Sequence, residues 1–212
     1  MKKYLNEKAL VGLRNYKYKS GEYGVLDHVM AHWWNYALEF VPIWMAPNLV
    51  TLTGLAALLS GFFMVISHDL TMQADIPYWV SIYLSFALFL YQTLDAIDGK
   101  QARRTGTSSP LGQLFDHGCD AFATFCVLYS FCHIVNLTPD NPIFSFLYIG
   151  FICAFYAANW EEGHTHCLRC CTTIFGVTFG LTESQWIMIL TLLLNGLTNN
   201  GFKTITLGEL YP

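Results

Sequence analysis

Four aspartates lie at regular spacing between two long apolar stretches of the chain: Asp95, Asp98, Asp116 and Asp120. The first two are three positions apart and the last two are four apart, so each pair shares one face of a helix. A short connection makes the two helices antiparallel neighbours, and both pairs can then converge on one pocket. A carboxylate in a bilayer costs roughly 2.5–3.5 kcal/mol at a helix centre, so the group indicates a functional site.

Converging carboxylate oxygens favour hard divalent cations such as Mg²⁺, Mn²⁺ or Ca²⁺ over zinc. Two such ions about 4 Å apart favour phosphoryl-type transfer, because they bind both the attacking and the leaving oxygen. Gly99, Ala102 and Gly112 are small where a bulky ligand must approach the backbone. Arg103 can pair with phosphate oxygens, and the flanking Lys100 and Arg104 add positive potential. The structural alternative is a salt-bridge cluster at a helix end.

The composition is that of an integral membrane protein. Hydrophobic residues make up 54% of the 212 residues and charged residues 12%, whereas soluble domains carry about 25% charged residues. Five apolar stretches predict membrane-spanning helices, at residues 49–67, 77–94, 111–137, 143–160 and 184–197. Gly54 and Gly61 in the first stretch suit close helix packing. We therefore predict an all-α, polytopic transmembrane helical bundle, with a basic loop over residues 100–110.

The chain divides into three parts: a cytoplasmic arm with an interfacial helix (1–47), a transmembrane core (48–203) and a tail (204–212). The arm carries six of the eleven basic residues and is expected on an anionic cytoplasmic leaflet. The positive-inside rule then places the aspartates at the cytoplasmic face.

Residues 24–41 predict an amphipathic helix before the first span. Two stripes recur at helical spacing, Val25, Val29, Trp33 and Tyr36, and Leu26, Met30, Trp34 and Leu38. An interfacial helix is favoured, and an ordinary helix packed on the bundle is the alternative.

The spaced residues resemble the signature of the CDP-alcohol phosphatidyltransferase class-I family, Asp95-x2-Asp98-Gly99-x2-Ala102-Arg103-x8-Gly112-x3-Asp116-x3-Asp120. Pro-Asn at 47–48 and the segments 108–112 and 115–120 are similar to its eukaryotic choline and ethanolamine phosphotransferase branch. The resemblance runs from about Leu13 to Trp186. It implies a six-helix core, of which the five spans are a part, with metal and nucleotide bound near the cytoplasmic face.

The resemblance implies two Mg²⁺ or Mn²⁺ ions held by Asp95, Asp98, Asp116 and Asp120. It implies CDP-alcohol contacts from Asn48, Gly99, Ala102, Arg103 and Gly112, with Arg103 on the diphosphate. The reaction would transfer phosphocholine or phosphoethanolamine from CDP-choline or CDP-ethanolamine to diacylglycerol, giving phosphatidylcholine or phosphatidylethanolamine and CMP. An endoplasmic reticulum or Golgi membrane is expected, with the lipid bilayer and no nucleic acid as partner, and a homodimer is left open.

A general base must take the proton of the attacking hydroxyl. Histidine changes its charge near neutral pH, and His117 lies beside Asp116. Glu183 opens the fifth span at the same membrane depth. We predict His117 with Glu183 as the base pair, ahead of Asp120 alone, because a carboxylate bound to a cation is a poor base. The alternatives are a histidine bonded to backbone and, for Glu183, a helix N-terminal cap.

A second cluster contains Glu161, Glu162, His164, His166, Cys167, Cys170 and Cys171. Its spacing is too compressed for a standard four-ligand zinc site, so an ordinary cytoplasmic loop is favoured over zinc or palmitoylated cysteines. The alternative function for the whole chain is a truncated, non-catalytic membrane protein that retains the nucleotide and metal site, because five spans are fewer than the family core has.

Overall fold

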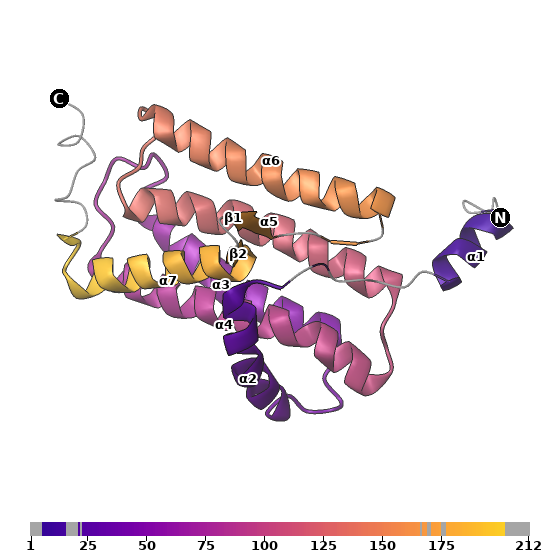
Figure 1. The fold of residues 1–212 in the computed structure, drawn as a ribbon. Coiled ribbons are helices and arrows are strands. Elements are labelled where there is room, and N and C mark those ends of the chain that lie inside the picture. Colours follow the sequence, from indigo (N-terminus) through magenta and orange to yellow (C-terminus); the bar gives the residue numbers. More distant parts are fainter. Residues whose placement is uncertain are drawn as a thin grey trace.

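The computed structural model describes residues 6–15, 21, 23–165, 167–168, 171–174 and 177–201. The helices are α1 (Glu7–Asn15), α2 (Val25–Glu39), α3 (Pro47–His68), α4 (Tyr78–Thr105), α5 (Pro110–Ile134), α6 (Pro142–Thr165) and α7 (Leu181–Leu197) (Figure 1). A short antiparallel hairpin, β1 (Thr172–Ile174) and β2 (Val177–Phe179), precedes α7. The predicted all-α bundle is confirmed, and the hairpin was not predicted. Residues 1–5, 16–20 and 22 of the basic arm and the tail at 204–212 lie outside the described residues.

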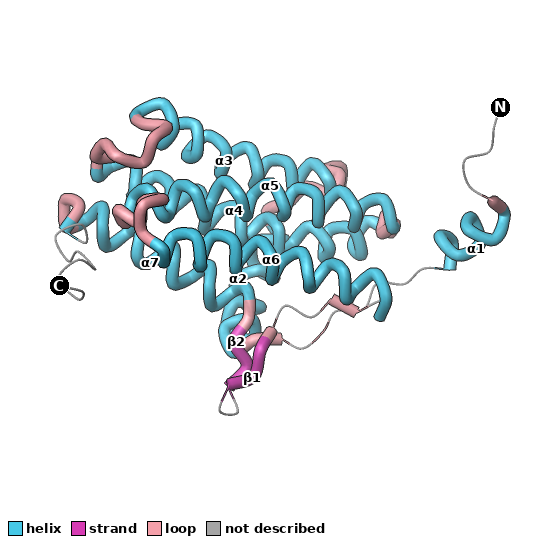
Figure 2. Tube along the Cα trace, turned by 90° about the horizontal axis from the view of Figure 1, so that it is seen from above, coloured by secondary structure: helices cyan, strands magenta, loops and turns pink. Residues whose placement is uncertain are grey.

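Three helices in the described part of the chain are long and apolar enough to cross a membrane: α3, α4 and α6. They correspond to the first, second and fourth predicted spans. The α5 helix carries two of the aspartates within its first half, and α7 has 17 residues. Both run alongside the other three in one bundle (Figure 2).

The α4 helix continues through residues 100–105, so the loop predicted there is wrong for those residues. The helix ends at Gly106, which has a left-handed φ of 68°. The Thr107 amide donates to the Ala102 carbonyl at 2.9 Å, as expected for a helix that closes on a left-handed glycine. As a result, Asp95, Asp98 and Arg103 belong to a single rigid helix.

Small residues allow α3 to approach α4 closely, as predicted. A Cβ on Gly61 would lie 2.7 Å from Leu84 Cδ1, and one on Gly54 would lie 3.2 Å from Leu94 Cβ. A side chain at either position would displace its neighbours on α4, so glycine allows the two helices to pack closely.

The α7 helix packs on another side of α4 by the same means. A Cβ on Gly196 would lie 2.4 Å from Ile82 Cγ1 and 2.9 Å from the Tyr78 carbonyl oxygen. The hydroxyls of Ser81 and Ser85 donate to backbone carbonyls of α7 at 2.6 and 2.9 Å. The α4 helix therefore lies at the centre of the bundle, between α3 and α7.

The turn between α3 and α4 is organised by Asp69. Its carboxylate accepts hydrogen bonds from the Thr71 hydroxyl and amide and from the amides of Gln73 and Ala74, at 2.6–2.7 Å. The Thr71 hydroxyl, followed by these amides, holds the pKa of Asp69 well below its usual range. The turn sets α3 and α4 antiparallel, which brings the beginning of α3 to the end of α4.

The amphipathic helix predicted over residues 24–41 is confirmed as α2. Of its two stripes, the one containing Met30 and Trp34 is buried against the bundle, and the one containing Val29 and Tyr36 is exposed. The helix thus packs on the bundle and also presents an apolar face outward, as an interfacial helix requires. Its location at the membrane interface stays a prediction.

We predict that Gly196→Ala lowers the thermal unfolding temperature of the detergent-solubilised protein. The added methyl overpacks the α4–α7 contact, which typically costs about 1–3 kcal/mol, even though alanine favours helix formation more than glycine does. Gly150→Ala on α6 is the matched control, because nothing lies within 4 Å of its Cβ position. Equal unfolding temperatures for the two variants would contradict this packing.

Candidate active site

Three helix ends meet at one end of the bundle. The α3 and α5 helices begin there, at Pro47 and Pro110, and α4 ends there. Proline suits the first helical position because the missing N–H has no partner in the helix anyway. Ser109 caps α5 through its hydroxyl, which accepts from the Gly112 amide at 3.1 Å. These ends carry almost all of the predicted site residues.

Three of the four predicted metal ligands converge. One carboxylate oxygen each of Asp95, Asp98 and Asp116 lies within 4.8 Å of the others. Asp95 and Asp98 come from α4 and Asp116 from α5, as the three- and four-residue spacings predicted. One oxygen of Asp95 and one of Asp116 are buried without a hydrogen-bond partner among the described residues. Unpaired, converging, negatively charged oxygens suit a divalent cation.

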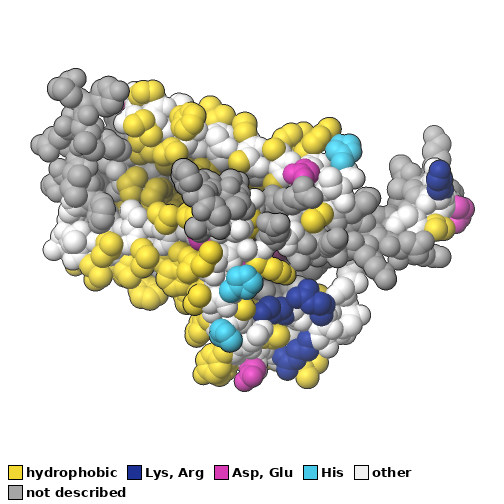
Figure 3. Space-filling view, viewed as in Figure 1, with side chains coloured by type: hydrophobic (Ala, Val, Ile, Leu, Met, Phe, Trp, Pro, Cys, Tyr) yellow, Lys and Arg dark blue, Asp and Glu magenta, His cyan; other side chains and the backbone are white. Residues whose placement is uncertain are grey.

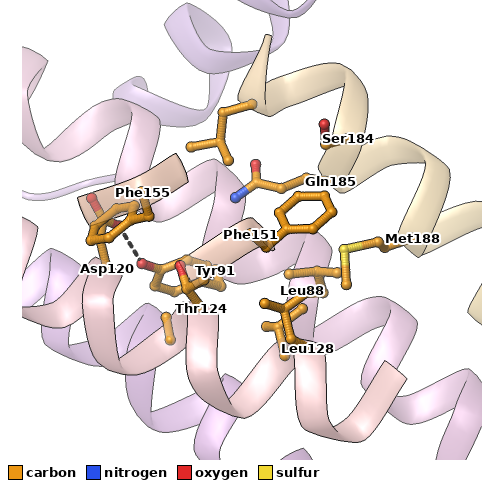
Figure 4. A pocket seen from close by; sticks show the side chains of 13 residues that line it. Leu88, Tyr91, Asp120, Thr124, Leu128, Phe151, Phe155, Ser184, Gln185 and Met188 are labelled. Atoms are coloured by element: carbon orange, nitrogen blue, oxygen red, sulfur yellow. Dashed lines mark hydrogen bonds between the residues drawn. The ribbon is translucent and has the colours of Figure 1, made fainter. Parts of the chain in front are cut away.

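Asp120 lies at the border of this cluster. Its carboxyl group faces that of Asp95 and accepts a hydrogen bond of 2.6 Å from the hydroxyl of the buried Tyr91. Asp120 also lines a partly open cleft between α4, α5, α6 and α7 (Figure 4). The other lining residues are mostly apolar, including Leu88, Phe151 and Met188. Of the four aspartates, Asp120 is therefore the one that borders the apolar cleft.

Thr51 of α3 holds one of the metal ligands and was missed in the sequence analysis. Its hydroxyl donates a short hydrogen bond to Asp98 Oδ2, and both residues are buried. Residues behind a metal ligand fix its orientation and tune its affinity. The sequence contains only a weak indication of this role for Thr51, which lies one helical turn after Asn48 on the helix expected to line the nucleotide pocket.

The three basic residues near the end of α4 have different contacts. Lys100 Nζ donates to Asn35 Oδ1 at 2.7 Å. Arg104 donates to two backbone carbonyls at 3.1 Å, that of Leu38 in the last turn of α2 and that of Val41 just after the helix. Both side chains hold α2 against α4. Arg103 is exposed, and its Nη1 lies 3.6 Å from the Cβ position of Gly99. Figure 3 shows one group of Lys and Arg side chains on the part of the surface where α2 lies, and a separate basic side chain on α1.

The small residues predicted to contact the nucleotide lie along the same helix ends. Gly99 and Ala102 are one turn apart on α4. A Cβ on Gly112 would lie 3.3 Å from Ser109 Oγ and 3.6 Å from Asn48 Oδ1, so Asn48 and Gly112 are neighbours across α3 and α5. The chain thus brings Asn48, Gly112 and the aspartates to one end of the bundle.

Glu183 has a structural environment that matches the alternative of a helix cap. Its Oε2 accepts from the Gly180 amide and its Oε1 from the Leu26 amide, both at 2.8 Å. The carboxylate therefore caps α7 and the beginning of α2 together. A Cβ on Gly24 would lie 2.5 Å from both carboxylate oxygens, so glycine is needed for this approach.

The carboxylate recorded beside His117 is that of Glu162. Its Oε2 lies 3.3 Å from His117 Nδ1. Glu162 belongs to the cluster that was expected to form an ordinary loop, but it lies in the last two turns of α6.

The remainder of the 161–171 cluster is only partly described, since His166 and Cys170 lie outside the described residues. His164 packs edge-on against the Trp160 ring, with centroids 5.2 Å apart. In the described ranges, the three aspartates are the one group of His, Cys, Asp or Glu side chains close enough to hold a metal ion.

Comparison with known proteins agrees with this geometry. The family model for CDP-alcohol phosphatidyltransferase matches residues 44–198. A CDP-alcohol phosphatidyltransferase class-I family protein of Dictyostelium discoideum is 37% identical over 203 residues, which cover 95% of this chain and 48% of that protein. Cholinephosphotransferase 1 of Bos taurus is 37% identical over 184 residues, which cover 86% of this chain and 44% of that protein.

The chain spans about half the length of the curated relatives it matches. The matched region contains all four aspartates, Arg103 and the helices that position them. The chain therefore belongs to the CDP-alcohol phosphatidyltransferase family.

Proposed function

We propose that the chain transfers phosphocholine or phosphoethanolamine from CDP-choline or CDP-ethanolamine to diacylglycerol, releasing CMP. The observation that carries this proposal is the convergence of Asp95, Asp98 and Asp116, together with Asp120, which faces Asp95 and lines an apolar cleft. A charged nucleotide and an apolar acceptor need such adjoining sites. The similarity to cholinephosphotransferase 1 supports the same substrate class.

The polar half of the site would bind the nucleotide. Mg²⁺ or Mn²⁺ held by the four aspartates would neutralise the diphosphate and make its β-phosphorus more electrophilic. Arg103 would pair with the diphosphate oxygens, because a guanidinium fits phosphate in a two-pronged geometry. Asn48 and Gly112 would border the cytidine, with Gly99 and Ala102 leaving room on α4.

The apolar half would receive the lipid acceptor. The cleft runs from Asp120 and Tyr91 along Leu88 and Leu128 to Met188 (Figure 4). Acyl chains can lie along this wall while the glycerol hydroxyl remains near the carboxylates. The helices bordering the cleft include two that can cross a membrane, α4 and α6, so a lipid has access from the bilayer.

The reaction requires one proton transfer. The acceptor hydroxyl oxygen forms a bond to the β-phosphorus, the bond from that phosphorus to the bridging oxygen breaks, and CMP departs with the electron pair. His117 would accept the hydroxyl proton. Asp120, the aspartate that lines the cleft, is the alternative proton acceptor. Glu183, whose two oxygens accept from backbone amides, is better suited to holding α7 and α2 than to the predicted role beside His117.

We further propose an endoplasmic reticulum or Golgi membrane, with the aspartates at the cytoplasmic face. Ten of the eleven basic residues fall on the cytoplasmic side in that orientation. Soluble CDP-alcohol would then reach the site directly from the cytoplasm.

Asp116→Asn should lower the transfer of labelled phosphocholine or phosphoethanolamine to diacylglycerol by about 1,000-fold or more. The amide keeps the size of the side chain but removes a charge from the cation site, and a 1,000-fold loss corresponds to about 4 kcal/mol. The measurement is product formation by purified protein with added Mg²⁺. Asp140→Asn, on the turn before α6, is the charge-matched control. Wild-type protein that binds CDP-alcohol without forming product would instead favour the non-catalytic alternative.

Thr51→Val should raise the Mg²⁺ concentration needed for half-maximal activity about 10- to 100-fold. Valine has the same shape but cannot donate to Asp98, so the metal ligand loses its orienting partner. Thr53→Val is the control, because the Thr53 hydroxyl bonds only within α3, to Leu49, and is exposed. An identical Mg²⁺ dependence in the two variants would remove Thr51 from the site.

His117→Ala and Glu183→Gln should affect different quantities. We expect His117→Ala to lower kcat about 100-fold or more in the folded protein, because it removes a proton acceptor. We expect Glu183→Gln to lower the unfolding temperature, because the charged cap of two helices is weakened, while the folded fraction keeps its kcat. A Glu183→Gln protein that folds normally and loses kcat would restore Glu183 as part of the base.

A further inference from the structure

The α6 helix has one buried residue among its 24, and that residue is a glutamate. None of the residues in the long apolar stretch of α6 is fully buried in the described part of the chain, whereas the side chain of Glu162 is only 7% exposed. Burial of a carboxylate costs far more than burial of an apolar side chain unless the carboxylate has partners. The helix therefore buries a carboxylate more completely than any of its apolar residues, which indicates a specific task for Glu162.

Two partners of Glu162 lie on one face of α5. Its Oε2 lies 3.3 Å from His117 Nδ1, and its Oε1 accepts a short hydrogen bond from Gln113 Nε2. Gln113 and His117 are four residues apart, so their side chains are neighbours on that face. The carboxylate thus bridges both side chains, with one oxygen on each.

This contact determines which imidazole nitrogen is free. A carboxylate beside Nδ1 favours the tautomer that carries its proton on Nδ1, and Nε2 then keeps its lone pair. The Gln113 amide holds the other carboxylate oxygen, so Glu162 cannot rotate away without losing that bond. The contact thus favours one tautomer and limits the rotation of the imidazole.

We propose that Glu162 is the positioning residue of His117, holding the imidazole so that Nε2 faces the acceptor hydroxyl. The inference rests on the proposed function, since it assigns the orientation of the proton acceptor in that reaction. Glu162 reaches His117 from α6, 45 positions further along the chain. It supplies the carboxylate partner that was expected from Glu183, whose oxygens accept from the amides of Gly180 and Leu26.

The test begins with Glu162→Gln, with Glu161→Gln as the matched control. Both substitutions remove one negative charge from adjacent positions of α6, but only the first touches His117. We expect Glu162→Gln to lower kcat about 10- to 100-fold, with the KM for the CDP-alcohol within about twofold of wild type. The KM should remain close to the wild-type value, because the substitution leaves the aspartates and Arg103 in place.

A double-mutant cycle shows whether the effect passes through His117. In a His117→Ala background, Glu162→Gln should cause no further loss of kcat, because the group that it positions is gone. The double variant Glu162→Gln with Gln113→Glu moves the carboxylate to α5, one turn from His117, and exchanges the two hydrogen-bonding groups. The kcat of this double variant should be at least about tenfold higher than that of Glu162→Gln alone.

Three outcomes would overturn the assignment. An active wild type with an unchanged kcat in Glu162→Gln would reject Glu162 alone and leave the proposed function intact. An additive loss in the His117→Ala background would show a purely structural effect. A wild-type protein with no transfer activity would reject the proposed function together with this inference. If Glu162→Gln fails to fold, Glu162→Asp takes its place in the test. Aspartate keeps the charge but is one methylene shorter, so its carboxylate lies farther from His117 and the same loss of kcat must follow.

Discussion

The concentration of negative charge at one end of the helical bundle is the constraint on which the rest of the structure depends. Asp95, Asp98 and Asp116 bring their oxygens within 4.8 Å of one another in a largely buried setting. Like charges at this distance repel strongly where the dielectric constant is low. Divalent cations bound between the oxygens would offset this repulsion. The neighbouring contacts, from Thr51 on Asp98 and from Tyr91 on Asp120, hold the carboxylates in place for them.

The bundle meets this constraint by making α4 rigid and central. Glycines on α3 and α7 allow both helices to lie against it, and the left-handed Gly106 ends it beyond the aspartates rather than before them. The basic residues of its last two turns then serve two purposes. Lys100 and Arg104 secure α2 through hydrogen bonds, while Arg103 is left exposed beside Gly99. The same short segment thus holds α2 in place and leaves one guanidinium group exposed at the site.

Two glutamates from distant parts of the chain show how similar residues acquire different tasks. Glu183 has backbone amides around its carboxylate and joins the beginnings of α7 and α2. Glu162 has side chains around its carboxylate, an imidazole and an amide on α5. Backbone amides make a carboxylate a cap, whereas an imidazole makes it an orienting partner. Neither task can be inferred from the residue type or its local sequence alone.

The sequence by itself determined the features that depend on local geometry. Helix periodicity was enough to place Asp95 and Asp98 on one face, to place Asp116 on a facing helix, and to predict the close packing at Gly54 and Gly61. Apolar length was enough to predict the bundle. Only the tertiary structure decided the contacts between residues far apart in sequence, such as Thr51 with Asp98 and Glu162 with His117. The physical reason is that helical spacing relates residues within one helix, whereas the rotation and depth of each helix against the next come from packing of the whole bundle.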